Sequence, residues 1–228
     1  MHGLNLTSGV KLAPENSTQT GTNQMDNPKQ NESEKDQYDP TSAPTQALPR
    51  IRPEATTDDS AFKEGQNRVL RMIATNAPLG EILENLVLLI EDQSPGMLCS
   101  VLLLSDDGDH IQHGAAPSLA PQYVKAVDGS PIGPKNGSCG TAMYRGKPVI
   151  VTDMFEDPLW EDYQDLARGS GLRACWSTPI LSTRGKVLGS FAMYYREPRT
   201  PTGEEAHLTS VATYIAGLAI ERKATSQG

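Results

Sequence analysis

The sequence predicts an α+β domain in which helices flank an antiparallel sheet. Apolar residues recur with helical spacing near both ends of residues 58–224. The strands between them come in pairs joined by short turns, as in β-hairpins. No strand–helix–strand crossover of the kind that builds parallel sheets separates these pairs. The strands are therefore expected to form one antiparallel sheet with helices packed on it.

Residues 1–57 differ in composition from the rest of the 228-residue chain. Phe, Trp and Cys are absent, Tyr38 is the single aromatic residue, and prolines recur throughout. A segment so poor in apolar side chains cannot offset the entropy cost of ordering its backbone. We expect a disordered N-terminal tail over 1–57, or a tail that folds on a partner. The folded domain then covers 58–224, and 225–228 form a disordered end.

The charge and the cysteines narrow the class of protein. The formal net charge is −8, which argues against a surface for nucleic acid or anionic membrane. No secretory signal is visible, and the longest wholly apolar run, residues 86–90, is too short to span a bilayer. Cys99, Cys139 and Cys175 cannot all pair and form no C-x-x-C motif. These features favour a cytoplasmic protein without a nucleic-acid or membrane partner.

Two helices and a hairpin are expected first. Phe62, Val69 and Ile73 share one face of a helix that ends before Pro78. A wide apolar stripe over 79–90 predicts the second helix. The remaining elements of this half follow from turns and short apolar runs. They are a strand over 97–104, an acidic turn over 106–109, a returning strand over 111–115 and a short helix over 121–127.

The second half is expected to alternate short helices with strands. The expected elements in chain order are a helix over 139–144, a strand over 148–151, a long connection over 152–172, a strand over 173–180, its hairpin partner over 187–195 and a final helix from Thr202. Compact domains rarely contain so long a connection without a functional use for it.

Residues 137–142, Gly-Ser-Cys-Gly-Thr-Ala, have the features of a ligand-binding helix start. Ser138 suits the N-cap, which places the Cys139 thiol at the positive end of the helix dipole, where a thiolate or anion is stabilised. Gly137 and Gly140 leave room for another group to approach the backbone. Cys139 is therefore a candidate reactive thiol or ligand contact. A small residue packed into a tight helix start is the equally weighted alternative.

We expect a small-molecule pocket between this helix, the 152–172 connection and the strand that contains Cys175. The candidate ligand-binding residues are Cys139, Thr141, Asp153, Phe155, Trp160, Tyr163, Cys175 and Ser177. Packing is the favoured alternative for Cys175, and capping of a loop is an equal alternative for Asp153. Trp176 is a further candidate wall, or ordinary core. The sequence points to no particular ligand or cofactor. The pair His110 and His113 does not favour a metal, since residues three apart in a strand face opposite sides.

Four segments carry a resemblance to the GAF domain family: residues 137–142, 148–153, 171–180 and 189–194. The segments are similar to the subtype found in bacterial sensor histidine kinases and diguanylate cyclases. The resemblance implies a PAS-related, six-stranded antiparallel sheet, with a helix pair on one face and a ligand pocket on the other. It also implies a homodimer through the terminal helices, and a histidine kinase or diguanylate cyclase as output domain or partner. No sequence signature of such an output domain is visible.

Three functions follow as alternatives. The first is a sensory domain that binds a small molecule or senses redox state and transmits the signal through its terminal helices. The second is an enzyme that resembles the free methionine-(R)-sulfoxide reductases, in which Cys139 would be catalytic. That family has a second cysteine before the following strand, whereas residues 152–172 contain none. The third is a dimerisation scaffold. A dimer is expected because the apolar stripes around Ile73 and Ile215 exceed what one sheet face must absorb.

Overall fold

A five-stranded antiparallel sheet is the centre of residues 57–226, the part of the chain that this computed structural model describes. The strand order is β2-β1-β5-β4-β3. The strands are β1 (Leu98–Leu104), β2 (Ile111–Ala115), β3 (Val149–Val151), β4 (Ala174–Leu181) and β5 (Val187–Tyr195). The α+β class is confirmed, with five strands in place of six. Almost all of the predicted tail lies outside the described residues.

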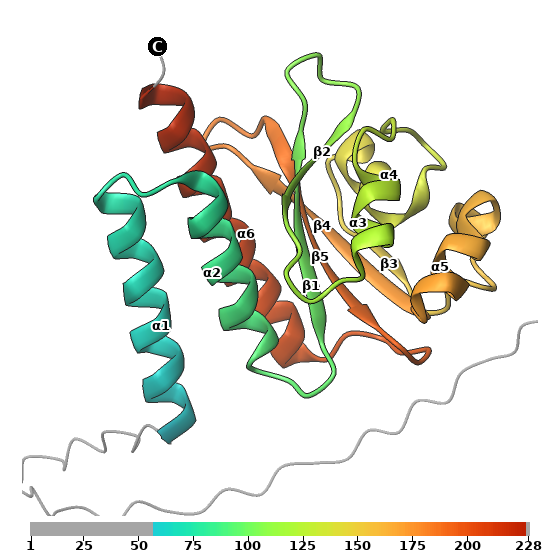
Figure 1. Cartoon of the computed structure of the whole chain (residues 1–228), viewed down its shortest axis with the longest axis horizontal. Helices are drawn as coiled ribbons and strands as arrows, with labels where there is room; N and C mark the ends of the chain where they lie inside the picture. The colour runs from blue at the N-terminus through green and yellow to red at the C-terminus, as the bar shows by residue number, and fades with distance from the viewer. Residues whose placement is uncertain (1–56, 227–228) are drawn as a thin grey trace, which may run out of the picture. The chain divides into compact units, whose positions relative to one another are not determined.

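Three long helices cover one face of the sheet (Figure 1). They are α1 (Thr57–Ala74), α2 (Leu79–Glu91) and α6 (Gly203–Ser226). Helix α2 packs on β1 and β2, α6 packs on β4 and β5, and α1 rests on α2 and α6. Helix α6 continues to Ser226, two residues beyond the expected end of the domain at 224. The α2 stripe, from Ile82 to Ile90, is buried as its spacing predicts.

The apolar stripes of the terminal helices are largely used within one chain. Val69 and Ile73 on α1, and Leu208 and Ile215 on α6, are all buried in the core that contains the long helices. The argument that these stripes exceed the needs of one sheet face is therefore wrong for these residues. The exposed apolar side chains of this layer are different ones: Leu70 on α1, Leu88 on α2 and Tyr214 on α6.

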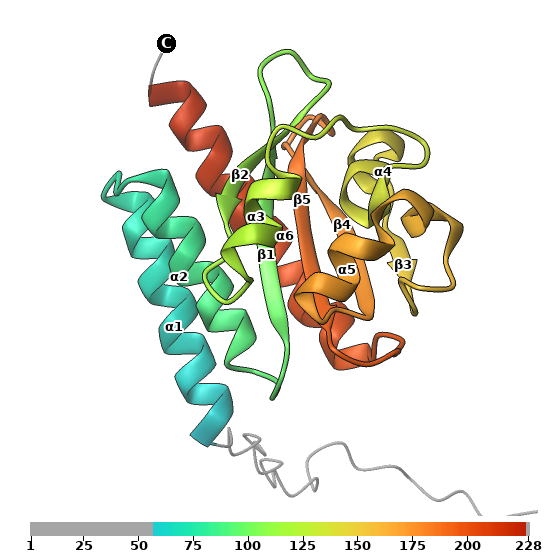
Figure 2. The same cartoon turned by 45° about the vertical axis from the view of Figure 1, so that its right-hand side comes forward.

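Short helices cover the opposite face of the sheet (Figure 2). They are α3 (Pro121–Val127), α4 (Gly137–Arg145), the 3₁₀ helix η1 (Pro158–Tyr163) and α5 (Gln164–Ser170). With this face of the sheet they enclose a second apolar core, separate from the one beneath the long helices. The predicted connection over 152–172 thus becomes η1 and α5, and it covers the face on which the pocket was expected.

Strand β5 lies in the middle of the sheet and is buried on both faces from Gly189 to Tyr195. Its neighbours β1 and β4 pair with it on either side. Gly189 permits the close approach of β1, because a Cβ there would lie 2.1 Å from the carbonyl oxygen of Leu102. Since side chains alternate along a strand, Tyr194 faces the short helices and Tyr195 faces the long ones.

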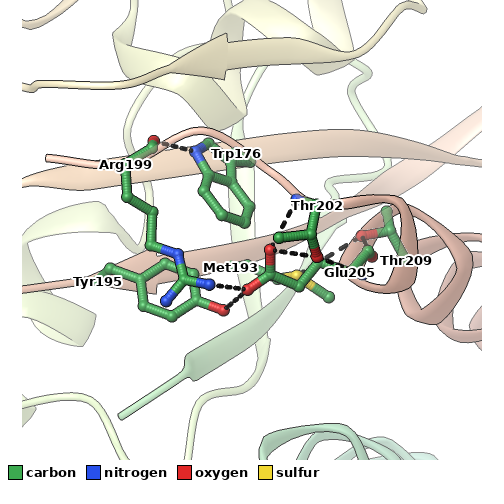
Figure 3. Close-up of polar contacts among 7 residues, drawn as sticks. All are labelled: Trp176, Met193, Tyr195, Arg199, Thr202, Glu205 and Thr209. Carbon is green, nitrogen blue, oxygen red and sulfur yellow. Dashed lines mark hydrogen bonds and ion pairs between the residues drawn. The ribbon is translucent and has the colours of Figure 1, made fainter. Parts of the chain in front are cut away.

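A buried carboxylate fixes the start of α6 to the end of β5 (Figure 3). Glu205 accepts hydrogen bonds from the hydroxyl of Tyr195 (2.5 Å), the guanidinium of Arg199 (2.7 Å) and the backbone amide of Thr202 (2.8 Å). Thr202 Oγ1 accepts from the Glu205 amide in return (3.2 Å), which completes a capping box. Arg199 lies over the Tyr195 ring at 4.1 Å and accepts at its carbonyl from the indole of Trp176 (3.1 Å).

Replacing this carboxylate should destabilise the domain. Glu205→Ala leaves the buried Tyr195 hydroxyl and the Thr202 amide without their acceptor, so we expect a loss of about 3 kcal/mol in the free energy of unfolding. Chemical denaturation monitored by circular dichroism measures it. Glu204→Ala, at the exposed neighbouring position, should change the stability by less than about 0.5 kcal/mol. Equal effects of the two variants would contradict this role for Glu205.

The contribution of Glu205 should also depend on pH. Burial disfavours its charged form, but the hydrogen bonds from Tyr195 and Thr202 and the charge of Arg199 outweigh burial and hold its pKa below the usual 4.5. A carboxyl whose pKa is lowered by folding stabilises the protein above its unfolded pKa, and this stabilisation is lost as the pH falls. The difference between wild type and Glu205→Ala should therefore be full above pH 4.5 and decline below it.

Candidate functional site

Helix α4 begins one residue before the predicted N-cap. Its N-cap position is Asn136, whose side chain makes no capping bond, and the first helical residue is Gly137 with φ of 57°. The backbone amide of Asn136 instead donates to Thr141 Oγ1 at 3.1 Å, which folds the preceding loop onto the helix. Gly140 is packed tightly there, because a Cβ would lie 3.0 Å from that of Asn136. The N-cap role expected of Ser138 is therefore wrong.

Ser138 instead joins the helix to the sheet and to the aromatic connection. Its hydroxyl accepts a hydrogen bond from the indole Nε1 of Trp160 at 2.9 Å and donates to the carbonyl oxygen of Cys175 at 3.2 Å. All three residues are buried. This bridge sets the position of Cys139, the next residue, relative to β4.

A small cavity lies between α3, α4, η1 and α5. Its volume is about 40 Å³, which holds two or three water-sized molecules. The α4 residues from Gly137 to Gly140 form one wall, and aromatic and aliphatic side chains form the others. These side chains belong to Ile111, Tyr123, Val127, Trp160, Tyr163 and Leu166. The cavity is thus mainly apolar, with the start of α4 as its polar wall.

The thiol of Cys139 lines this cavity and meets a set of hydrogen-bond donors behind it. Cys139 Sγ lies 3.5 Å from the hydroxyl of Tyr194. Groups that can donate to a thiolate, Cys175 first and then Tyr194, Ser177 and Ser190, outweigh the effect of burial and lower the pKa of Cys139 to about 7. Burial and the neighbouring Cys139 raise the pKa of Cys175 well above its usual range. Of the two thiols, Cys139 is therefore the one that ionises.

Two buried hydroxyls beside the Cys139 sulfur have no other use. Ser177 on β4 and Ser190 on β5 are fully buried, and their hydroxyls have no hydrogen-bond partner within residues 57–226. Buried polar groups are nearly always hydrogen-bonded, so such a pair needs an explanation. A sulfur that becomes an anion supplies one, because both hydroxyls can turn toward it.

The residues expected in the pocket divide into three groups. Cys139, Trp160 and Tyr163 line the cavity. Cys175 and Ser177 face the same side of the sheet but lie beneath Cys139. Thr141, Asp153 and Phe155 are not among the lining residues: Thr141 fastens the loop before α4, and the other two belong to a cluster near the surface. Trp176 packs in the core under the long helices.

The surface cluster holds the 152–172 connection against β4. Asp153 forms a two-pronged ion pair with Arg173 (3.0 and 2.5 Å) and also accepts from the Phe155 amide at 3.0 Å. The guanidiniums of Arg173 and Arg168 lie over the Phe155 ring at 4.4 and 4.8 Å. The Arg173 hydrogen bonds lower the pKa of Asp153, which therefore stays ionised. This arrangement is the loop-capping alternative for Asp153.

Sequence reasoning missed Tyr123, Ser190 and Tyr194. Ser190 and Tyr194 are polar side chains in a mostly apolar strand, β5, and because they are four residues apart they face the same side of the sheet. That spacing could have identified a polar face on this strand. Their position next to Cys175, however, depends on the β4–β5 register, which pairs Cys175 with Tyr194. No cluster of metal-binding side chains and no helix able to span a membrane occurs within residues 57–226.

A twisted antiparallel sheet with long helices on one face and a small cavity under short helices on the other defines a class of α+β domains. Residues 76–221 match the family model described as GAF domain. The chain belongs to the GAF domain family.

Similar proteins include sensors and an enzyme. Over 156 residues the chain is 44% identical to the methyl sulfide methyltransferase-associated sensor of Methanosarcina acetivorans, covering 68% of this chain and only 16% of that protein. A domain of a putative two-component sensor histidine kinase from Sinorhizobium meliloti 1021 has 23% identity and a TM-score of 0.54, covering 66% of this chain and 99% of that one. Free methionine-R-sulfoxide reductase from Neisseria meningitidis has 16% identity and a TM-score of 0.56, and the match covers 75% of this chain and 95% of that one. The last two show a shared fold.

The Ser138 bridge should be measurable as stability. Ser138→Ala removes the acceptor of the buried Trp160 indole, and we expect a loss of about 1–3 kcal/mol in the free energy of unfolding. Ser210→Ala, on the exposed side of α6, serves as the control and should lower the free energy of unfolding by less than about 0.5 kcal/mol. Urea denaturation followed by tryptophan fluorescence reports both. An unchanged midpoint for Ser138→Ala would show that the bridge contributes nothing.

Proposed function

We propose that this GAF domain is a sensory module: it binds a small molecule or responds to redox state at the Cys139 cavity and transmits the change through its terminal helices. The observation that carries the proposal is the pair of adjacent residues Tyr194 and Tyr195. The first contacts the Cys139 thiol, and the second binds Glu205 at the start of α6. A displacement at the cavity thus reaches α6 through a single peptide unit.

The similarity to a sensor supports this reading. At 44% identity the match to the methyl sulfide methyltransferase-associated sensor is the sequence comparison that bears on function. The chain spans about a sixth of that protein (16%), so the similarity concerns a domain and its sensory role. An output domain or partner of the histidine kinase or diguanylate cyclase type is part of the proposal, as is a cytoplasmic location.

A metabolite requires the cavity to open. At about 40 Å³ the space is far below the several hundred Å³ of ordinary ligand sites. Trp160 and Tyr163, which stack edge to face at 6.2 Å, form the wall that has to move. A ligand that holds this wall open would shift the population toward an open state.

Blocking the cavity mouth should abolish ligand binding. Ala126 lines the cavity yet is exposed, so Ala126→Trp fills the mouth without disturbing the core. Native mass spectrometry of the chain purified under gentle conditions should show bound small molecules as an excess over the polypeptide mass. The excess should disappear in Ala126→Trp and persist in Gln122→Trp, an exposed position on the same helix. No excess in the wild type would reject the ligand-binding form of the proposal and leave the redox form.

A homodimer through the terminal helices is the second part of the proposal. Leu70 on α1 is 39% exposed, and it lines a shallow surface depression with Asn67, Arg71 and Ala74. Leu70→Glu should lower the mass in sedimentation experiments from dimer to monomer, because a carboxylate would be buried in the contact. Tyr144→Glu, on the layer of short helices and 58% exposed, should leave the dimer intact. A dimeric Leu70→Glu protein would place the contact elsewhere.

The alternative function is a free methionine-(R)-sulfoxide reductase-like enzyme. It is favoured by one observation: Cys139, whose pKa is lowered to about 7, directly follows Ser138, which donates to the carbonyl oxygen of a second cysteine, Cys175, at 3.2 Å. Incubation with free methionine-R-sulfoxide and a dithiol reductant, followed by quantification of methionine, discriminates the two functions. Turnover that is lost in Cys139→Ser would establish the enzyme, and its absence in a folded protein would leave the sensor.

A further inference from the structure

We propose that Cys139 and Cys175 form a peroxide-sensitive pair, in which Cys139 is oxidised in the cavity and Cys175 then closes a disulfide with it. The inference rests on the redox form of the proposed function and names its stimulus. It is carried by the place of the two thiols: Cys139 lines the cavity, whereas Cys175 lies directly beneath it and is fully buried.

The two thiols are held together by more than one contact. Both belong to the apolar core under the short helices, and the hydroxyl of Ser138, the residue before Cys139, donates to the Cys175 carbonyl oxygen at 3.2 Å. Tyr194 stands opposite Cys175 in the β4–β5 register and touches Cys139 Sγ. Both cysteines are reduced in this structure.

The surroundings of Cys139 fit a thiolate. Its sulfur is near the N-terminal end of α4, where backbone amides point toward negative charge. The hydroxyls of Ser177 and Ser190, which are buried and have no hydrogen-bond partner within residues 57–226, are near enough to donate to a thiolate there. Because its pKa is lowered to about 7, Cys139 ionises more readily at neutral pH than an ordinary thiol does. Tyr194, whose pKa is raised by burial, stays protonated and can donate.

The size of the cavity selects the oxidant. A space of about 40 Å³ admits water-sized molecules and excludes bulky ones. Hydrogen peroxide fits, and the apolar walls formed by Ile111, Val127 and Leu166 exclude larger polar oxidants. Cys99, the third cysteine, is fully buried in the other core, and its pKa is raised well above the usual range. It therefore provides an internal control in the same molecule.

The chemistry balances in two steps. The Cys139 thiolate attacks one peroxide oxygen, the O–O bond breaks, and the departing hydroxide takes a proton to leave as water, so that Cys139 becomes a sulfenic acid. The sulfur of Cys175 then attacks the Cys139 sulfur, the S–O bond breaks, and the hydroxide leaves with the Cys175 proton as a second water. Two thiols are oxidised by two electrons and one hydrogen peroxide is reduced. A dithiol reductant reverses the disulfide.

Peptide mapping of the full chain tests the pair. The reduced wild-type protein is treated with hydrogen peroxide, quenched with an alkylating reagent and digested. We expect a cross-linked peptide that joins Cys139 to Cys175, two hydrogens lighter than the reduced pair, and oxidation of Cys139 at least roughly tenfold faster than that of Cys99. Equal rates at Cys139 and Cys99, or a folded protein without the cross-link, would overturn the proposal.

Variants assign the two roles. In Cys175→Ser, Cys139 should stop at the sulfenic acid and be trapped by dimedone, whereas Cys99→Ser should form the disulfide as the wild type does. Cumene hydroperoxide, too bulky for the cavity, should react at least roughly tenfold more slowly than hydrogen peroxide. A Cys175→Ser protein that yields no dimedone adduct, or equal rates for the two peroxides, would overturn the assignment. The wild-type mapping decides the question even if a variant fails to fold.

A separate measurement distinguishes failure of this inference from failure of the sensory function. Hydrogen exchange of the α6 start, residues 199–209, is compared before and after oxidation. A disulfide that forms and changes this exchange supports both. A disulfide that leaves it unchanged confirms the thiol pair and counts against transmission through α6. A bound ligand in native mass spectrometry without any disulfide rejects the thiol pair and keeps the sensor.

Discussion

The central strand β5, buried on both faces, is the constraint on which the rest of the structure depends. Each of its side chains must fit one of two cores, and the alternation along the strand decides which. Tyr194 is fully buried on the cavity side, with its ring edge-on to Tyr123 at 5.7 Å. Tyr195 is buried on the other side. Neither ring can move freely, because protein cores are close-packed and transmit strain.

Polar groups inside the two cores are arranged in different ways. The carboxylate of Glu205 has a full set of donors and a cation beside it, which makes the base of α6 a stable joint. Around Cys139 the hydroxyls of Ser177 and Ser190 lack hydrogen-bond partners within residues 57–226. The Glu205 group therefore stabilises a single conformation of the domain. The hydroxyls near Cys139 would gain a hydrogen-bond acceptor if the thiol became a thiolate, so they lower the free energy needed to place a negative charge at the cavity.

Much of the fold could be predicted from the sequence, since it depends on local spacing. The apolar period of α2, the hairpin turns and the alternation in β4 and β5 are properties of short windows. The face shared by Cys175 and Ser177 followed from the same alternation. The number of strands came from family resemblance, and the structure has one fewer.

The site was less predictable, because its contacts join distant parts of the chain. The local sequence predicts Ser138 to be an N-cap, but its hydroxyl instead accepts a hydrogen bond from Trp160, 22 residues away. Asp153 and Phe155 were predicted to line the pocket. Arg173, 20 residues from Asp153, instead pairs with Asp153 and packs on the Phe155 ring, which places both in a cluster near the surface. Tyr194 was not predicted as a site residue because it contacts Cys139, which is 55 residues away in the sequence. Spacing within a window carries no information about such pairs.

Helix α1 begins at one end of its layer, and α6 ends at the other (Figure 1). A helical segment that continues α6 would therefore prolong the layer along its own axis. Each residue of an α-helix turns it by about 100°, so inserting a single residue into such a junction would rotate everything beyond it by more than a quarter turn. The length of a junction, and not only its sequence, then decides which surface faces the next domain.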